Sequence, residues 1–257
     1  MQSRWGTHAD HPAVVLAPSS AMECFDLMVG AFNISERFRM PVIVLYDEIV
    51  GHMREKVSLP SPDEIEVVNR LRPSVPPEWY IPYENTPSGV PPMGIFGDGY
   101  RYHVTGLTHD LRGFPTSRPD EVSVFISRLH RKIKQGLEHT QFADGFFTEE
   151  MDILVIAYGI TARSAFKAVK DARLAGIRAG LLKLKTLWPF MERAVIATAA
   201  KAKTVVVPEM NIGQIAGEVE RVVYKTHQKI RVIQVNRVDG TIITPEEILG
   251  AIQGQAR

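Results

Sequence analysis

The sequence predicts an α/β protein built largely on parallel sheets. Short apolar runs alternate with segments of helical periodicity at both ends of the chain, which is typical of parallel strands joined by helices. A proline-rich, aromatic stretch separates these two ends. The chain has 257 residues, of which 45% are hydrophobic and 23% charged, as in an ordinary globular protein. We therefore expect two α/β zones, residues 1–72 and 148–257, with a different kind of structure between them.

The first zone has the pattern of a βαβ unit. An apolar run at 13–17 is followed by Ser19 and Ser20, either of which can cap a helix over 21–38. Pro41 then opens a second apolar run at 42–46. Two such strands joined by a helix predict a parallel pair. The spacing of five apolar side chains places them on one face of the helix, namely Met22, Phe25, Met28, Val29 and Phe32.

The middle zone excludes regular secondary structure over much of its length. Nine of the 17 prolines lie between Pro60 and Pro92, and proline interrupts helices and central strands. Aromatic residues are interleaved with these prolines, whereas a flexible linker would be polar and poor in aromatics. We expect an ordered, extended arm that packs on this chain's sheet or on a partner. A charged helix over 119–138 is expected to bridge the arm, within residues 73–147, to the last zone.

The last zone predicts a doubly wound α/β domain. Strands are expected at 153–158, 179–184, 204–207 and 230–235, and helices at 162–175, 192–201, 214–225 and 245–252. Thr244 and Pro245 are typical of the N-cap and the first position of the final helix. Gly159 follows the first of these strands, but GxGxxG and GxxxxGK[ST] are both missing, so we favour a tight turn over a phosphate cradle there.

Composition excludes several classes of function. Thirty Lys and Arg against 29 Asp and Glu give a net charge of +1, which leaves no basic excess for nucleic acid. The single cysteine, Cys24, on a helix face that we expect to be buried, excludes a disulfide or a cysteine-held iron–sulfur cluster within the chain. No apolar run reaches about 18 residues, so we expect no membrane span and a cytoplasmic location.

Candidate site residues follow the ends of two predicted strands. Asp47 and Glu48 end the second strand of the first zone, with His52 and Arg54 just beyond. Ligands of parallel sheets collect at such ends. Here the alternative is a salt-bridged loop that covers the sheet edge. Similarly, three polar residues follow the strand at 204–207, where they are either helix-entry capping groups or interface contacts, namely Glu209, Asn211 and Gln214.

The histidines and the nucleophiles give weaker signals. His8 and His11 are three residues apart, but their surroundings do not predict a helix and no third metal ligand is evident, so we expect no metal site. His103 and His109 lie in the arm, where a ligand-binding role is an alternative to packing. No GxSxG motif is present, and no residue is identified as catalytic.

Three segments carry a resemblance to a known family. LYDEIVGHMREKV (residues 45–57), together with LAPSSAMECFDL (16–27) and VPEMNIGQ (207–214), resembles the alpha subunits of 2-oxoacid:ferredoxin oxidoreductases, most closely the 2-oxoglutarate type. The resemblance covers essentially the whole chain. It implies oxidative decarboxylation of 2-oxoglutarate or a related 2-oxoacid on thiamine diphosphate, transfer of the acyl group to coenzyme A, and reduction of ferredoxin.

The resemblance also implies how the domains and cofactors are divided between the subunits. Residues 1–72 would be the C-terminal part of a thiamine-pyrimidine-binding domain, and residues 148–257 a domain similar to the C-terminal domain of transketolase. A beta subunit would share the thiamine diphosphate and carry the iron–sulfur cluster, with gamma and delta subunits as further candidate partners. We expect no cofactor on this chain alone.

The chain departs from the family pattern at its start. Family members carry a further N-terminal segment with a YPITPS-like motif, a substrate-contacting Thr and an activating Glu, and MQSRWGTHAD resembles an internal segment. We therefore expect a chain truncated at its start, with exposed sheet edge and apolar surface and a tendency to self-associate. The alternative function is that of a non-catalytic assembly module. A third candidate is a nucleotide-binding regulatory domain, but the glycine-rich fingerprint of such a domain is missing from the sequence.

Overall fold

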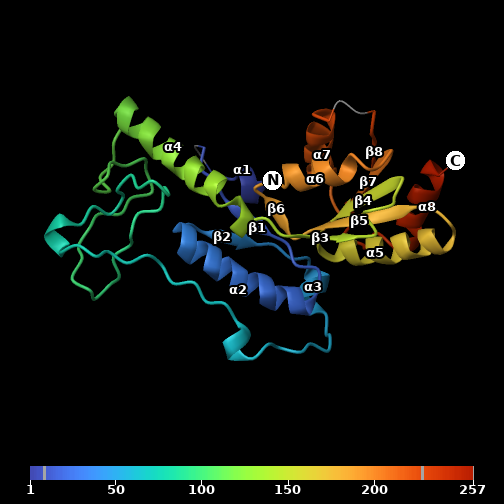
Figure 1. The fold of residues 1–257 in the computed structure, drawn as a ribbon, viewed down its shortest axis with the longest axis horizontal. Helices are drawn as coiled ribbons and strands as arrows, with labels where there is room; N and C mark the ends of the chain where they lie inside the picture. Colours follow the sequence, from blue (N-terminus) through green and yellow to red (C-terminus); the bar gives the residue numbers. More distant parts are fainter. Residues whose placement is uncertain (8–9, 227–228, 257) are drawn as a thin grey trace.

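The computed structural model describes residues 1–7, 10–226 and 229–256. It is elongated (Figure 1), with an α/β unit at one end, a small sheet in the middle and the arm at the other end. The α/β class and the parallel sheets expected from the sequence are confirmed.

The middle of the molecule contains the predicted βαβ unit. Strands β1 (Val14–Leu16) and β2 (Val42–Val44) are parallel, with Val14 opposite Val42, and α2 (Ala21–Phe38) connects them. The Ser20 hydroxyl caps α2 by accepting a hydrogen bond from the Glu23 backbone N–H at 3.1 Å. Two short helices were not expected, α1 (Gln2–Trp5) and α3 (Glu48–His52); α3 lies where the sequence indicated a loop.

The apolar face chosen for α2 is wrong. The side chains that α2 buries against β1 and β2 are Leu27, Ala31, Ile34 and Phe38. Phe32, by contrast, is 67% exposed, Met28 is also exposed, and Cys24 is only partly buried. Periodicity could not choose between the faces, because α2 is apolar on both. The exposed apolar face agrees with the apolar surface that the sequence led us to expect.

The second sheet has the doubly wound arrangement. Within the described residues its strand order is β3-β5-β4-β7-β8, formed by β3 (Ala143–Phe146), β4 (Ile153–Ala157), β5 (Ala179–Leu184), β7 (Thr204–Glu209) and β8 (Arg231–Asn236). The strands expected from the sequence pair in parallel. The edge strand β3 is antiparallel and was not expected.

Helices cover both faces of this sheet. One apolar cluster packs α6 (Glu192–Ala199) and α7 (Gln214–Tyr224) on one face, and another packs α5 (Gly159–Leu174) and α8 (Pro245–Gln255) on the other. Thr244 caps α8 in a capping box with Glu247, and Pro245 is its first residue, as predicted.

One strand of the last zone crosses into the middle sheet. Strand β6 (Thr186–Trp188) follows β5 and pairs antiparallel with β1, so that the middle sheet has the order β2-β1-β6. Strand β6 was not expected from the sequence. Because β5 and β6 are almost continuous, the two sheets are held close together.

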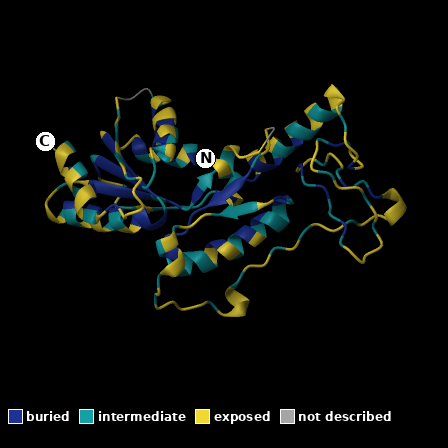
Figure 2. Cartoon of the chain, turned by 180° about the vertical axis from the view of Figure 1, so that it is seen from behind, coloured by how far each residue is buried: buried dark blue, intermediate teal, exposed yellow. Residues whose placement is uncertain are grey.

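The arm, residues 59–116, is ordered and packs on α2 and on α4 (Pro119–Gln135). Its short helical turns are η1 (Pro62–Glu64) and η2 (Pro77–Trp79). A third such turn, η3 (Leu137–His139), follows α4. Asn33 and Glu36 of α2 hydrogen-bond to Val68 and Arg70 of the arm. Figure 2 shows that much of the outer surface of the arm is exposed.

Cationic side chains hold the proline-rich part of the arm. Proline lacks an N–H, so this segment offers more backbone acceptors than donors. Arg39 donates to the carbonyl oxygens of Pro82 and Pro92, and Arg131 donates to that of Thr86. Lys132 donates in turn to the carbonyl oxygens of Phe38 and Arg39 at the end of α2. The guanidinium groups of Arg39 and Arg131 therefore supply donors that the prolines lack.

A buried tyrosine fixes the turn of the arm. Tyr80 is 7% exposed, and its hydroxyl donates to the Pro92 carbonyl at 3.0 Å while accepting from the Gly94 N–H at 2.9 Å. We predict that Tyr80→Phe lowers the free energy of unfolding by about 1 kcal/mol, because it leaves both backbone groups unpaired. Chemical denaturation measures the change. The exposed Tyr224→Phe serves as the control, and equal effects of the two substitutions would contradict the role of the buried hydroxyl.

Candidate functional site

A cavity of about 270 Å³ lies between the two sheets. Four strands direct their carboxyl ends toward it: β1 and β2 of the middle sheet, and β4 and β7 of the second sheet. Its lining includes Asp47, Tyr158, Gly159, Asn211 and Gln214. Because ligands of parallel sheets bind at the carboxyl ends of strands, this cavity is the candidate site.

Asp47 reaches from the middle sheet to the first turn of α5. Its Oδ2 accepts a hydrogen bond from the Ile160 N–H at 2.7 Å. Gly159 has a φ of +56°, and a Cβ there would lie 2.4 Å from that Oδ2. The glycine therefore permits both the turn and the close approach of the carboxylate. A carboxylate of this chain thus occupies the place where a phosphate would bind a helix N-terminus, in agreement with the turn reading of Gly159.

The carboxylate of Glu209, at the end of β7, caps the first turn of α7 in the same way. It is 1% exposed, and its carboxylate accepts from the Ile215 N–H at 2.9 Å and the Ala216 N–H at 2.7 Å. Asn211 Oδ1 accepts from the N–H groups of Gly213 and Gln214, both at 2.9 Å. Both residues therefore act as helix-entry capping groups, which was one of the two roles predicted for them.

Tyr158 is a residue that the sequence analysis missed. Its hydroxyl lies 3.1 Å from Glu209 Oε2, to which it donates, and accepts from Asn211 Nδ2 at 2.9 Å. Burial, and then the Glu209 carboxylate, raise the pKa of Tyr158 well above its ordinary value. The phenol therefore stays neutral at physiological pH and works as a fixed hydrogen-bond donor. Its position at the end of β4, next to Gly159, was the available signal.

The opposite wall of the cavity contains a stacked cation. The Arg4 guanidinium lies 3.6 Å from the centroid of the Trp188 ring and 4.2 Å from that of Trp5. It also pairs with Glu218 of α7. Arg4 thereby joins α1, β6 and α7 around the cavity.

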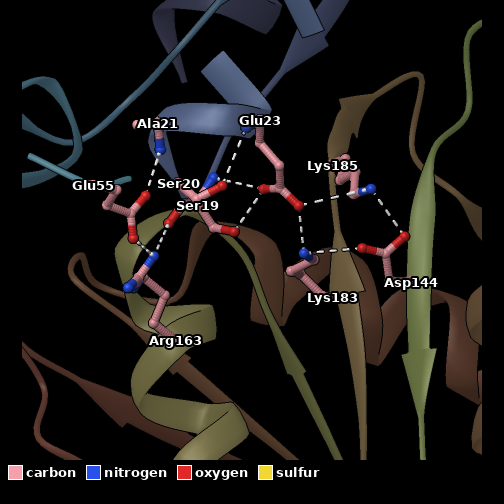
Figure 3. A network of polar contacts seen from close by, with 9 residues as sticks. All are labelled: Ser19, Ser20, Ala21, Glu23, Glu55, Asp144, Arg163, Lys183 and Lys185. Carbon is pink, nitrogen blue, oxygen red and sulfur yellow. Dashed lines mark hydrogen bonds and ion pairs between the residues drawn. The ribbon is translucent and has the colours of Figure 1, made fainter. Parts of the chain in front are cut away.

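A network of charged groups joins the two units beside the cavity (Figure 3). Glu23, in the first turn of α2, pairs with Lys183 of β5 and also contacts Lys185. Asp144 of β3 pairs with each of these lysines at 2.9 Å. The carboxylates alternate with the ammonium groups, so every charge faces an opposite one.

Glu55 makes a second contact of this kind. Its Oε2 accepts from the Ala21 N–H at the start of α2 at 2.8 Å, and its Oε1 lies 2.6 Å from the Arg163 guanidinium of α5 (Figure 3). The two loops that follow β2 and β1 are therefore fixed to α5.

The remaining predicted residues lie away from the cavity. Glu48 and His52 are exposed on α3, where their side chains approach to 3.9 Å. Arg54 is exposed on the segment after α3. Of the seven predicted site residues, Asp47, Asn211 and Gln214 line the cavity, and the buried Glu209 supports it through Tyr158.

The described histidines do not gather into a metal site. His8 lies outside the described residues. His109 is packed between Tyr83 and Phe125, with ring centroids at 4.0 and 4.6 Å, and His103 stacks on Phe114. In the described part of the chain, no three His, Cys, Asp or Glu side chains are placed to hold a metal ion.

The cavity does not fit a diphosphate group. The helix N-termini that border it, those of α5 and α7, already bind the carboxylates of Asp47 and Glu209. These carboxylates would repel a phosphate and compete for the same N–H groups.

None of the described helices is long and apolar enough to span a bilayer.

Two family models match this chain. Residues 1–125 match the model "Pyruvate flavodoxin/ferredoxin oxidoreductase, thiamine diP-bdg", and residues 151–248 match "Pyruvate:ferredoxin oxidoreductase core domain II".

Curated relatives match nearly the whole chain. The 2-oxoglutarate synthase subunit KorA of Methanothermobacter thermautotrophicus is 46% identical over 98% of this chain and 66% of the relative. The subunit of the same name from Methanocaldococcus jannaschii is 41% identical over 99% of this chain and 67% of the relative. The ketoisovalerate oxidoreductase subunit VorB of Methanothermobacter marburgensis is 29% identical over 96% of this chain and 62% of the relative. The chain thus spans about two thirds of the length of these relatives.

A solved structure shares the fold throughout. The 2-oxoglutarate:ferredoxin oxidoreductase of Magnetococcus marinus, solved with 2-oxoglutarate, coenzyme A and succinyl-CoA bound, matches with a TM-score of 0.87 at 25% identity. The match covers 100% of this chain and 44% of that chain.

The contact between Asp47 and α5 can be tested by mutation. We predict that Asp47→Ala lowers the free energy of unfolding by about 1 kcal/mol, because the first turn of α5 loses its cap. The neighbouring Glu48→Ala, whose side chain is exposed, is the matched control and is expected to change stability by less than about 0.5 kcal/mol. Indistinguishable denaturation curves for the two variants would exclude the capping role.

The charged network predicts a dependence on pH. Burial alone would raise the pKa of Glu23. Hydrogen bonds from Lys183 and Ser19 outweigh this effect and lower the pKa below its ordinary 4.5. Because the folded pKa is depressed, the contribution to stability is present above pH 4.5 and is lost as the pH falls through the folded value. We predict that Glu23→Gln lowers stability by about 2 kcal/mol at pH 7, and that the difference from wild type shrinks in acid.

Melting temperatures measured between pH 7 and pH 3 provide this test. Glu149→Gln, which removes an exposed partner of Lys201, is the control and is expected to show little difference at either pH. A Glu23→Gln deficit that stays constant across the range would show that the carboxylate charge is not the cause.

Proposed function

Because this chain belongs to the family of 2-oxoacid:ferredoxin oxidoreductase alpha subunits, we propose that it works as the alpha subunit of such an enzyme. The enzyme would decarboxylate a 2-oxoacid oxidatively, transfer the acyl group to coenzyme A and reduce ferredoxin. The observation that carries this proposal is identity above 40% over nearly the whole chain to several 2-oxoglutarate synthase subunits.

The proposed substrate is 2-oxoglutarate. The relatives named for this substrate are 40–46% identical to the chain, whereas those named for ketoisovalerate are 28–29% identical. The solved structure with the matching fold also contains bound 2-oxoglutarate. A branched-chain 2-oxoacid is the competing substrate that the assay must include.

The cofactors and partners of the complex are proposals as well. Thiamine diphosphate would bind with its diphosphate on a beta subunit, since the helix N-termini beside the cavity are occupied by Asp47 and Glu209. The same beta subunit would hold the iron–sulfur cluster, because the chain has a single cysteine. Ferredoxin and coenzyme A would meet the complex, with gamma and delta subunits as further candidates, in the cytoplasm.

The chain would supply structure to the complex rather than reacting groups. We place the division of the chain at residues 1–72, 73–147 and 148–257, as the end of a pyrimidine-binding domain, the arm with its bridging helix, and the second domain. Many of the polar groups around the cavity are engaged in helix caps or ion pairs within the chain. This supports the alternative that the chain is an assembly module. An assembly module would hold the subunits together as proposed but would have no part in the active site.

The exposed face of α2, with Met28 and Phe32, would be covered in the complex or by self-association.

Reconstitution tests the proposed function. The chain is combined with a beta subunit of this family, with and without a polypeptide corresponding to the third of the relatives that it does not span. Reduction of a viologen dye that depends on coenzyme A is measured with 2-oxoglutarate and with 3-methyl-2-oxobutanoate. We predict turnover with 2-oxoglutarate, about tenfold faster than with the branched acid, only when all three components are present.

Two outcomes would contradict the proposal, and a third would change only its substrate. Absence of turnover from a stable complex of all three components would argue against the oxidoreductase function. Turnover by the chain and the beta subunit alone would show that the additional polypeptide is not needed. Faster reduction with 3-methyl-2-oxobutanoate would reassign the substrate while leaving the reaction class intact.

A further inference from the structure

A second cavity, of about 290 Å³, lies between the arm and α4. Its wall is largely apolar and aromatic, formed by Tyr83, Leu111, Val124 and Phe125. His109, 8% exposed, also lines it. His109 Nδ1 donates to the Asp110 carbonyl at 2.9 Å, and burial lowers the pKa of His109, so the ring is neutral at physiological pH. This part of the wall therefore presents uncharged rings to the cavity.

The buried cation of this cavity is Arg128. Arg128 is 4% exposed, and its hydrogen bond to the Gly89 carbonyl is long at 3.4 Å. In the described part of the chain, no carboxylate lies within 4 Å of its guanidinium nitrogens. A guanidinium carries five N–H donors, so most of those of Arg128 remain available to a molecule in the cavity.

The surroundings of Arg128 add to the positive charge. Burial, and then the charge of Arg39, lower the pKa of Arg128 to about 10, with Arg131 adding to the effect. Arg39 and Arg131 are themselves bound to backbone carbonyl oxygens of the arm and not to acids. A buried cation that lacks a counter-ion is costly, and an anionic ligand would remove that cost.

Three acidic residues also line the cavity and limit the kind of anion. Arg118 pairs with Asp120 at 3.0 Å and with Glu121 at 3.4 Å, and Asp110 Oδ1 accepts from two backbone N–H groups. These carboxylates are engaged, but they still repel an entering anion. The repulsion is larger for a phosphate, which carries nearly two charges, than for a single carboxylate.

We propose that this cavity binds a small monocarboxylate with an apolar, ring-sized body. The carboxylate pairs with the guanidinium of Arg128 in the forked geometry that arginine favours. The body lies against the wall formed by Tyr83, Leu111 and Phe125. A volume near 300 Å³ is at the small end of ligand cavities, which suits a molecule of this size.

Calorimetric titration of the full chain with benzoate is the test. Benzamide has the same shape without the charge, and inorganic phosphate has the charge without the apolar body. We expect saturable binding of one benzoate per chain, at least about tenfold tighter than either comparison compound. Equal binding of benzoate and benzamide, or no binding of benzoate, would overturn the proposal.

Variants locate the binding in this cavity. Arg128→Met is expected to abolish benzoate binding, whereas Lys134→Met, which removes one charge from the exposed side of the same helix, is expected to retain it. Val124→Trp keeps Arg128 and fills the cavity from a position that is 43% exposed, so it tests the cavity even if Arg128→Met does not fold. Benzoate binding that survives Val124→Trp in a folded chain would refute the site. The titration needs no oxidoreductase assay, so its result is independent of the function proposed above.

Discussion

The arrangement of the two sheets depends on carboxylates that lie between them. Asp47, from the loop after β2, caps α5, while Glu23, at the start of α2, pairs with Lys183 near the carboxyl end of β5. Glu55 joins the start of α2 to Arg163 of α5. Strand β6 adds a backbone connection, since it follows β5 in the chain and pairs with β1. These contacts bring the carboxyl ends of both sheets to one cavity.

The same carboxylates limit what the cavity can bind. A helix N-terminus attracts phosphate through its free N–H groups and its dipole. At α5 and α7 those N–H groups bind Asp47 and Glu209 instead. The interactions that fix the two sheets therefore remove the anion sites that the fold would otherwise offer. This agrees with the proposal that a partner subunit would hold the diphosphate group.

Local signals were sufficient for much of the fold. Ser20 and Pro41 bounded α2 and β2, and Thr244 with Pro245 located the start of α8. The position of residues after apolar strands also selected Asp47, Asn211 and Gln214, which the structure brings to one cavity. Long-range pairing was beyond these signals. Strand β6 is three residues long and is defined by a partner at the other end of the chain, and Asp47 meets Ile160 across 113 positions. The apolar face of α2 was misassigned because both faces carry apolar side chains.

Titration of the chain alone with thiamine diphosphate and Mg²⁺ tests the central claim most directly. The account predicts no binding at micromolar concentrations, and binding once a beta subunit of the family is present. The charge-removing variant Asp47→Asn provides the matched comparison, because it reduces the repulsion at α5 while keeping the shape of the side chain. Tight binding of the cofactor by the wild-type chain without a partner would contradict the account, because it would require an anion site that Asp47 and Glu209 leave no room for.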